Sequence, residues 1–200
     1  QGYDEDELAR ILDWADVVCI GCGLGTGETS GRILEGTLRK VNVPCIIDAD
    51  GLNLLSRKMD LLEAMHSPVI LTPHMKEMSR LTGYPISGLS DRRLEIIREF
   101  TEKYPAVCVL KDSRTFVKER GRHPFFNLAG NSAMAKAGSG DVLAGVITGL
   151  SAQGMPAYES AALGVYLHAC GGDEAKEAKG SYSVLARDLI AGIEKCMDEK

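Results

Sequence analysis

Short apolar runs that alternate with helix-like segments constrain the fold of this chain more than any other feature. Strand-like runs occur in "VVCI" at residues 17–20, "CIIDAD" at 45–50, "SPVILTPH" at 67–74 and "AVCVL" at 106–110. Apolar residues at helical spacing precede the first of them, at Leu8, Ile11 and Leu12. Strands that alternate with helices predict an α/β fold with a mainly parallel central sheet and helices on both faces.

Local signals predict where several elements begin and end. Thr72 and Pro73 suit the N-cap and the first position of a helix that stops at Gly83. The segment "AVCVLKDSRTFVKER" at 106–120 predicts a hairpin of two strands joined by a tight polar turn. Further helices are expected over residues 31–40, 91–104, 141–153, 156–179 and from 183 to the C-terminus.

Length, composition and charge exclude several classes of protein. The 200 residues are 44% hydrophobic, which suits one domain over residues 1–200 with a substantial core. The net charge of −5 and the lack of a basic run argue against a nucleic-acid-binding surface. No apolar stretch reaches membrane-spanning length, and the start of the chain lacks the apolar core of a signal peptide. We therefore expect a cytoplasmic protein that binds neither nucleic acid nor membrane.

The six cysteines favour reduced thiols over disulfides or a metal centre. Cys19, Cys45 and Cys108 lie in apolar runs, where a free thiol packs as a small hydrophobe. Cys19 and Cys22 form a single C-x-x-C without a second pair or a histidine at ligand spacing. We therefore expect no metal site built from these side chains.

Polar residues and glycines collect where the predicted strands end. The segments concerned are 21–27, 48–53, 72–77 and 111–115, together with the turn before Asp141. In open α/β sheets, ligands bind beyond the carboxyl ends of the strands. The coincidence predicts a binding site at that edge of the sheet.

The glycine-rich loop "GCGLGTG" at 21–27 does not have the spacing of a dinucleotide-binding fingerprint. The sixth position is Thr26 when counted from Gly21, and Glu28 when counted from Gly23. A Rossmann-type site is therefore not expected. The glycines allow a ligand to approach the backbone closely, but a plain turn would also require some of them, and both interpretations stay open.

The segment "AGSGD" at 137–141 is the most informative. Small residues at a helix start let backbone N–H groups turn inward and bind an anion. An acid beside such a site, here Asp141, can deprotonate a hydroxyl that attacks a phosphoryl group. Asp141 could instead only stabilise the helix start, by about 0.3–1 kcal/mol. Ser139 could cap the helix without an acid, which weakens that second interpretation.

Three further residues have both a functional and a structural interpretation. Lys111 and Thr115 in "LKDSRT" could contact phosphate, or they could form the solvated tip of a hairpin. His74 lies at a strand-to-helix turn, where it could bind a ligand or cap the helix. His168 lies mid-helix and is expected to pack or to hydrogen-bond locally.

The segment "GNSAMAKAGSGDVLAGVITGLSAQG" at 130–154 resembles the glycine-rich signature of the ATP/ADP-dependent NAD(P)H-hydrate dehydratases, a family of the ribokinase-like superfamily. Four other segments match that family in the same order: "ADVVCIGCGLG" (15–25), "IIDADGLNLL" (46–55), "LTPHMKEMSRLTG" (71–83) and "VLKDSRT" (109–115). Five ordered matches over nearly the whole chain are specific, whereas the Gly-Ser-Gly-Asp element alone would indicate only the superfamily.

The resemblance implies a ribokinase-like fold and the repair of hydrated NADH or NADPH. Such enzymes use ADP or ATP, with Mg²⁺, to phosphorylate the C6 hydroxyl of the hydrated nicotinamide ring, and phosphate is then eliminated. By the same resemblance, Asp141 is the catalytic base and binds the hydrate together with Gly23, Gly25 and His74. The nucleotide-binding residues that it implies are Lys111, Asp112, Ser113, Arg114, Thr115, Asn131, Gly138, Ser139 and Gly140, with Asn127 also near the phosphates.

The chain departs from the family pattern in three places. Met75-Lys76 stands where Pro-Gly is common, and Ala137-Gly138-Ser139-Gly140 stands where Gly-Gly-Thr-Gly is common. The family's domain also normally begins well before residue 15, so we expect the N-terminal part of the domain to be missing here. That upstream segment, or a fused or separate hydrate epimerase, is therefore an expected partner, and we also expect a homo-oligomer.

Two other functions stay open at this point. A small-molecule kinase of the same superfamily, acting on a sugar or a vitamin alcohol, would use Asp141 in the same way. A non-catalytic nucleotide-binding remnant is the second. The "TPH" and "DADGLNLL" segments favour the dehydratase. The sequence does not distinguish ADP from ATP, or one hydrate from the other.

Overall fold

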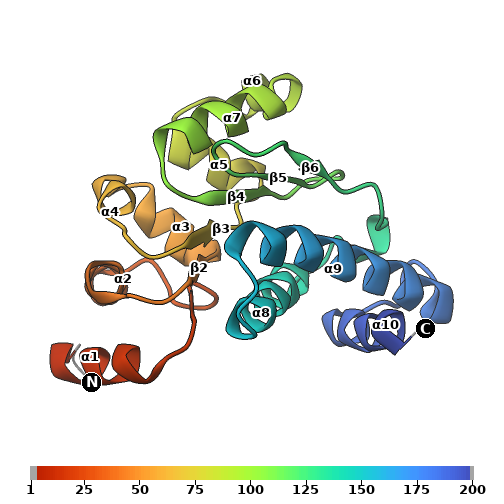
Figure 1. The fold of residues 1–200 in the computed structure, drawn as a ribbon. Helices are drawn as coiled ribbons and strands as arrows, with labels where there is room; N and C mark the ends of the chain where they lie inside the picture. The colour runs from red at the N-terminus through yellow and green to blue at the C-terminus, as the bar shows by residue number, and fades with distance from the viewer. Residues whose placement is uncertain (1–3, 199–200) are drawn as a thin grey trace.

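The computed structural model describes residues 4–198, and a six-stranded sheet lies at its centre (Figure 1). The strands cross the sheet in sequence order: β1 (Val18–Ile20), β2 (Cys45–Ile47), β3 (Val69–Leu71), β4 (Val107–Leu110), β5 (Phe116–Lys118) and β6 (Phe125–Phe126). Strands β1 to β4 are parallel, and β5 and β6 are antiparallel to their neighbours. Parallel neighbours need long crossover connections, which the helices supply.

Helices cover both faces of the sheet, so the predicted mainly parallel α/β fold is confirmed. The helices are α1 (Glu5–Trp14), α2 (Glu28–Lys40), α3 (Ala49–Leu55), α4 (Asp60–Glu63), α5 (Met75–Thr82), α6 (Ile86–Asp91), α7 (Arg93–Lys103), the 3-10 turn η1 (Ser132–Met134), α8 (Ser139–Ala152), α9 (Ala157–Lys179) and α10 (Ala186–Asp198). Helices α2 to α7 pack on one face, with α1 against α2, and α8 and α9 cover the other. Among residues 4–198, no helix combines the length and apolarity that crossing a bilayer requires.

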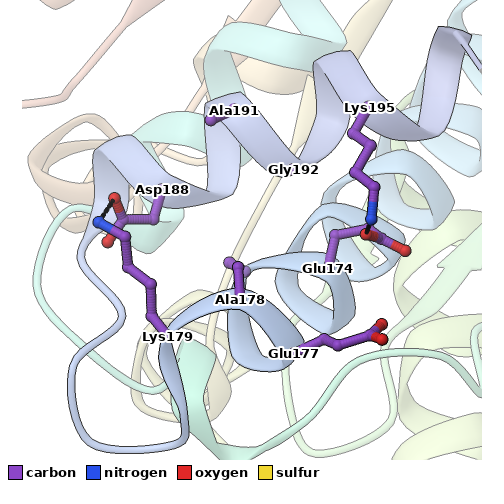
Figure 2. Close-up of a pocket in the computed structure, with 9 residues that line it drawn as sticks. Glu174, Glu177, Ala178, Lys179, Asp188, Ala191, Gly192 and Lys195 are labelled. Carbon is purple, nitrogen blue, oxygen red and sulfur yellow. Dashed lines mark hydrogen bonds and ion pairs between the residues drawn. The ribbon is translucent and has the colours of Figure 1, made fainter.

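Helix α10 packs along the outer side of α9, and ion pairs join the two helices (Figure 2). Lys179 binds the carboxylate of Asp188 at 2.6 Å, and Lys195 pairs with Glu174. A cleft of about 240 Å³ lies between these pairs, and its apolar part is built mainly from small residues. The pairs hold the C-terminal helix in place.

Alternate residues of each inner strand enter opposite cores. In β2, Cys45 and Ile47 contact the side chains of the α1–α7 layer, whereas Ile46 contacts those of α8 and α9. All three are fully buried. A strand that is covered on both faces has no solvent side, which explains why these runs are continuously apolar rather than alternating with polar residues.

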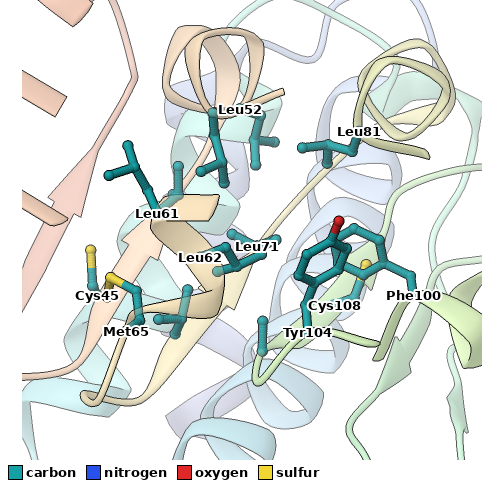
Figure 3. Close-up of a cluster of buried hydrophobic side chains, with 14 of the residues drawn as sticks. Cys45, Leu52, Leu61, Leu62, Met65, Leu71, Leu81, Phe100, Tyr104 and Cys108 are labelled. Carbon is teal, nitrogen blue, oxygen red and sulfur yellow. The ribbon is translucent and has the colours of Figure 1, made fainter. Parts of the chain in front are cut away.

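The larger core lies under α2 to α7 (Figure 3). Leu62 and Leu71 are fully buried within it, and the rings of Phe100 and Tyr104 pack at a tilt of 47° with centroids 4.9 Å apart. Burying one such leucine contributes about 1.5–3 kcal/mol to stability. This packing fixes the strands, and therefore also the polar segments that follow them.

The predicted hairpin is present at residues 106–120. Strand β4 pairs with β5 in antiparallel register, with Leu110 opposite Phe116. Strand β6 is not predicted by the sequence pattern. It forms because Phe126 pairs with Phe116 on β5, and their rings pack edge to face with centroids 4.7 Å apart.

The prediction for the start of α5 is wrong. Its N-cap is His74 rather than Thr72, and the helix begins at Met75 rather than at Pro73. The backbone N–H of Thr72 donates to the carbonyl of Ile47 at 3.2 Å, so the parallel ladder runs one residue beyond β3. The extended backbone after β3 therefore continues past Thr72, the residue that the Thr-Pro signal predicts to cap the helix.

The six cysteines are free thiols. Cys45 and Cys108 are buried as predicted, and burial raises the pKa of the Cys45 thiol to about 12. The prediction that Cys19 lies in the core is wrong, since this side chain is exposed. Strand β1 is an edge strand of the sheet, so it is covered less completely than the inner strands.

Candidate functional site

A cavity of about 960 Å³ lies at the carboxyl ends of the parallel strands, between the β4–β5 turn and the first turn of α8. Leu143 and Val165 give it an apolar wall. Eight of the nine residues predicted to contact a nucleotide line it, as does His74: Lys111, Asp112, Ser113, Arg114, Thr115, Asn131, Ser139 and Gly140. Ligands of open α/β sheets bind at this edge.

The β4–β5 turn is held from both sides. Arg93 in α7 pairs with Asp112, and the guanidinium of Arg114 donates to the carbonyl of Leu128 at 3.1 Å. The backbone of Lys111 forms a bridge with the segment after β3, so the turn starts in the plane of the sheet. The turn therefore has a fixed place in the cavity wall.

The start of α8 combines an anion-binding helix end with a carboxylate. Gly138, with φ +85°, adopts the left-handed conformation that precedes the helix, and no side chain caps the first amide groups. Gly140 in the first turn lines the cavity, and the helix dipole adds positive potential there. Asp141, in the same turn, is exposed and lies outside the residues that line the cavity. The helix end therefore places uncapped amide groups at the cavity and a carboxylate just outside its lining.

Ser139, which could have capped α8, does not do so, because the N-cap residue is Gly138. Its hydroxyl lies 3.3 Å from Nε2 of His168, and both side chains are buried. Burial lowers the pKa of His168 to about 4, so the imidazole is neutral at physiological pH. His168 hydrogen-bonds to a residue 29 positions earlier rather than locally, and it joins α9 to the start of α8 at the cavity wall.

Charged groups from three elements meet beside this helix start. The ammonium of Lys111 lies 2.7 Å from Oδ1 of Asp48, whose side chain is only 2% exposed. A Cβ on Gly140 would lie 3.5 Å from Lys111 Nζ and 3.7 Å from Asp48 Oδ2, so the backbone of α8 rests on this ion pair. Ligand atoms of Asp48, Asp141 and Cys22 all lie within 4.8 Å of one another. The wall between the cavity and Asp141 is therefore a charge cluster.

Cys22, Asp48 and Asp141 are the one group in residues 4–198 with metal-ligand spacing, and they do not fit Mg²⁺. Burial and then a hydrogen bond with Asp141 raise the pKa of the Cys22 thiol to about 12, so the thiol stays protonated. Mg²⁺ requires oxygen ligands, and the carboxylate of Asp48 already pairs with Lys111. We derive no step through a metal at these residues.

His74 lines the cavity and also caps α5. Its Nδ1 accepts a hydrogen bond from the backbone N–H of Glu77 at 3.1 Å, and Glu77 accepts one from the backbone N–H of His74 at 2.8 Å. In this reciprocal capping box Nε2 lies 3.4 Å from the other oxygen of Glu77, so both ring nitrogens lie close to Glu77. The two interpretations of His74 are thus compatible in one side chain.

Gly23 and Gly25 lie outside the cavity, in the loop after β1. Both have positive φ angles, +69° and +76°. The backbone N–H of Gly25 donates to Oδ2 of Asp50 at 2.9 Å, which ties the loop to the segment after β2. Cys22 of the same loop approaches Asp141. The loop therefore lies on the Asp141 side of the charged wall.

Asn131 lines the cavity, but its amide group is engaged in the fold. Its Nδ2 donates to Oδ1 of Asp173 at 2.7 Å and to the carbonyl of Gly172 at 2.9 Å. Its Oδ1 accepts from the backbone N–H of Ala133 at 2.9 Å and so starts η1. Gly138 lies outside the cavity lining and sets the backbone path instead.

Comparison with protein-family models gives a match to the NAD(P)H-hydrate dehydratase family over residues 1–195. The chain belongs to this family. The predicted resemblance is thereby confirmed.

Two curated relatives carry related names. The bifunctional NAD(P)H-hydrate repair enzyme of Moorella thermoacetica is 40% identical over 185 residues, which are 92% of this chain and 35% of the relative. The ADP-dependent (S)-NAD(P)H-hydrate dehydratase of Neisseria meningitidis is 37% identical over 190 residues, which are 94% of this chain and 62% of the relative. The chain thus spans between about a third and two thirds of the length of these relatives.

Two solved structures have the same fold. A ribokinase-like superfamily protein from Enterococcus faecalis superposes with a TM-score of 0.85 at 34% identity, covering 97% of this chain and 66% of its own. The ADP/ATP-dependent NAD(P)H-hydrate dehydratase from Bacillus subtilis, co-crystallised with ATP and Mg²⁺, superposes with a TM-score of 0.81 at 27% identity, covering 96% and 69%. The ribokinase-like fold predicted for this dehydratase family member is confirmed.

Sequence reasoning missed two residues of the site in this dehydratase family member. Asp48 follows β2 and carried the right signal, a carboxylate at the end of a buried strand, but nothing in the sequence pairs it with Lys111. His168 lies in the middle of α9, where histidine gives no signal of its own. Both contacts join residues far apart in the chain, at separations of 63 and 29 positions.

Proposed function

We propose that this chain carries out the nucleotide-dependent dehydration of hydrated NADH and NADPH, which returns the intact reduced cofactors. The observation that supports this most is the arrangement at the start of α8. A cavity with Lys111 and an uncapped helix end lies on one side, and the carboxylate of Asp141 lies beside it. The names of the relatives and the family match agree with this chemistry.

In the proposed reaction, a nucleotide fills the cavity with its phosphates at the first turn of α8. Lys111 and the amide groups of that turn stabilise the negative charge on the transferring phosphoryl group. Asp141 accepts the proton of the C6 hydroxyl, whose oxygen then bonds to phosphorus while the nucleotide leaves as the shorter phosphate. The C6–O bond of the phosphate ester then breaks and phosphate leaves with the bonding electrons, a proton is lost from the neighbouring ring carbon, and the electron pair of that C–H bond forms the nicotinamide double bond again.

Other roles follow from the same proposal. The hydrate lies on the Asp141 side, against Gly23 and Gly25, and the ring of His74 would contact it from the cavity side. ADP or ATP is the donor. Mg²⁺ would arrive with the nucleotide phosphates, because the side chains near Asp141 do not build a site for it.

We further propose a single cytoplasmic domain over residues 1–200, active as a homo-oligomer. Its proposed partner is an upstream segment of the domain or a fused or separate hydrate epimerase.

Recovery of the absorbance of the reduced nicotinamide ring tests the function directly. Hydrated NADH and hydrated NADPH are each incubated with the chain and with ADP, with ATP or without nucleotide. We expect absorbance to return only where nucleotide is present, together with release of phosphate. If a phosphorylated compound accumulates and no absorbance returns, the chain is a kinase. If nucleotide binds but nothing is converted in any arm, the chain is a non-catalytic binding protein.

A further inference from the structure

The carboxylate of Asp48 occupies a capping position that it does not use. Asp48 is the N-cap residue of α3, and aspartate is among the residues most favoured there because its oxygens accept from the first helical amides. No such bond is made. The side chain turns away from its own helix to bind Lys111 at 2.7 Å.

The backbone around Asp48 is held in conformations that proteins usually avoid. Ala49 has φ +48°, the left-handed region that a residue with a side chain rarely adopts. Gly21, with φ +128°, lies so close that a Cβ on it would come within 1.8 Å of the Asp48 carbonyl oxygen. Strain of this kind clusters at functional sites, where the placement of one group decides activity.

The charges near Asp48 explain why its placement matters. Asp48 and Asp141 are negative and close to each other, and Lys111 is the cation bound to Asp48. Asp112, the acidic neighbour of Lys111 in the turn, is already paired with Arg93. If Asp48 lost its charge, Lys111 could pair with the other carboxylate of this cluster, that of Asp141. A carboxylate that holds an ammonium is a weaker base.

We propose that Asp48 is a positioning residue, which keeps Lys111 at the nucleotide side of the wall and away from Asp141. This inference rests on the proposed function and assigns to Asp48 a part in it. Asp48 touches neither nucleotide nor hydrate in this scheme, since it does not line the cavity and its side chain is only 2% exposed. It acts through Lys111, so that one cation serves the phosphates while a neighbouring carboxylate stays free to accept a proton.

The test uses Asp48→Asn, Lys111→Met and the double variant in the 200-residue chain. Asparagine keeps the shape of the buried side chain and removes its charge, and methionine keeps the length of lysine without the ammonium. We expect Asp48→Asn to lower kcat about tenfold. ADP affinity, measured by calorimetry, should be several-fold weaker, because Lys111 would then pair with Asp141 and leave the phosphate side of the wall. In the Lys111→Met background, Asp48→Asn should have no further effect on kcat.

Asp188→Asn is the matched control. Asp188 is also buried and also binds a lysine, Lys179 at 2.6 Å, but between α9 and α10 (Figure 2), and neither residue lines the cavity. We expect this variant to lower the unfolding midpoint and to leave kcat and ADP affinity unchanged. It shows what loss of a buried ion pair does when the site is not involved.

Two results would overturn the positioning role. One is unchanged or tighter ADP binding in Asp48→Asn, and the other is an additive loss of kcat in the double variant. Loss of hydrate turnover by the unmodified chain would overturn the proposed function instead. In that case the ADP titrations alone decide the inference: unchanged or tighter binding by Asp48→Asn contradicts it, and weaker binding that disappears in the Lys111→Met background supports it.

Discussion

Lys111 and Asp141 both lie at the start of α8, but they have different positions relative to the cavity. Substitutions of the two residues should therefore differ in their effects on turnover and on ADP affinity. Lys111 lines the cavity, whereas Asp141 does not. We expect Asp141→Asn to abolish hydrate turnover while ADP affinity stays within about threefold, since one exposed charge beside the phosphates contributes little to binding. Turnover and calorimetric ADP titration measure the two effects. Near-normal turnover would remove Asp141 from the role of base.

His168 makes stability depend on pH. Burial lowers its pKa from 6.5 to about 4, so between these values the unfolded chain binds a proton that the folded chain does not. Stability is therefore complete above about pH 6.5 and falls as the pH drops to about 4, by about 3 kcal/mol. Urea unfolding across this range should show the loss. His168→Gln should flatten the curve, whereas the exposed His66→Gln should leave it as steep as before.

The residues found from sequence and those missed differ in the kind of contact they make. Lys111 and Asp141 stand in local patterns, a polar hairpin turn and a small-residue helix start, which can be recognised without knowing the fold. Asp48 carries a strong local signal for capping that tertiary contact overrides, because an ammonium offers it a stronger partner than helix amides. Contacts across 63 positions have no signature in a single sequence.

Among the elements, long segments with a clear period were predictable and short ones were not. The inner strands and the long helices α8 and α9 follow from continuous apolar runs and helical spacing. The four-residue α4 and the six-residue α6 are too short to show a period, and they form because the connection must bury Leu62 and Leu89. Strand β6 has two residues and depends on its partner.

The contact between α9 and α10 depends on two glycines. A Cβ on Gly192 would lie 2.2 Å from the carbonyl oxygen of Gly171, so the helices touch backbone to backbone. We expect Gly192→Ala to force them apart and to lower the free energy of unfolding by about 1–3 kcal/mol. Gly145→Ala on α8 is the control, because its Cβ would meet nothing within 4 Å, and it should raise stability slightly. Equal urea midpoints for the two variants would contradict the close contact.

For the whole molecule, the cavity joins the two helical layers. His74, at the start of α5, and the β4–β5 turn form one part of its wall, and residues of α8 and α9 form the other. ADP at a hundred times its Kd should therefore stabilise the fold by about 2.7 kcal/mol, which raises the unfolding midpoint by roughly 5–10 °C. Thermal unfolding with and without ADP measures this. Lys111→Ala should show a smaller shift at the same ADP concentration, and an equal shift would place Lys111 outside the site.

The order in which the two faces of the sheet are covered has a consequence for how the protein is made. Ile46, Ile70, Val107 and Val109 face α8 and α9, whose contacting residues lie between positions 143 and 165. A chain leaving the ribosome has completed the four parallel strands well before that cover emerges, so one apolar face stays open to chaperones or to other nascent chains. The carboxylate of Asp141 arrives on the covering helix itself. Closure of the core and assembly of the proposed catalytic wall are therefore one late event, and an interrupted chain has neither.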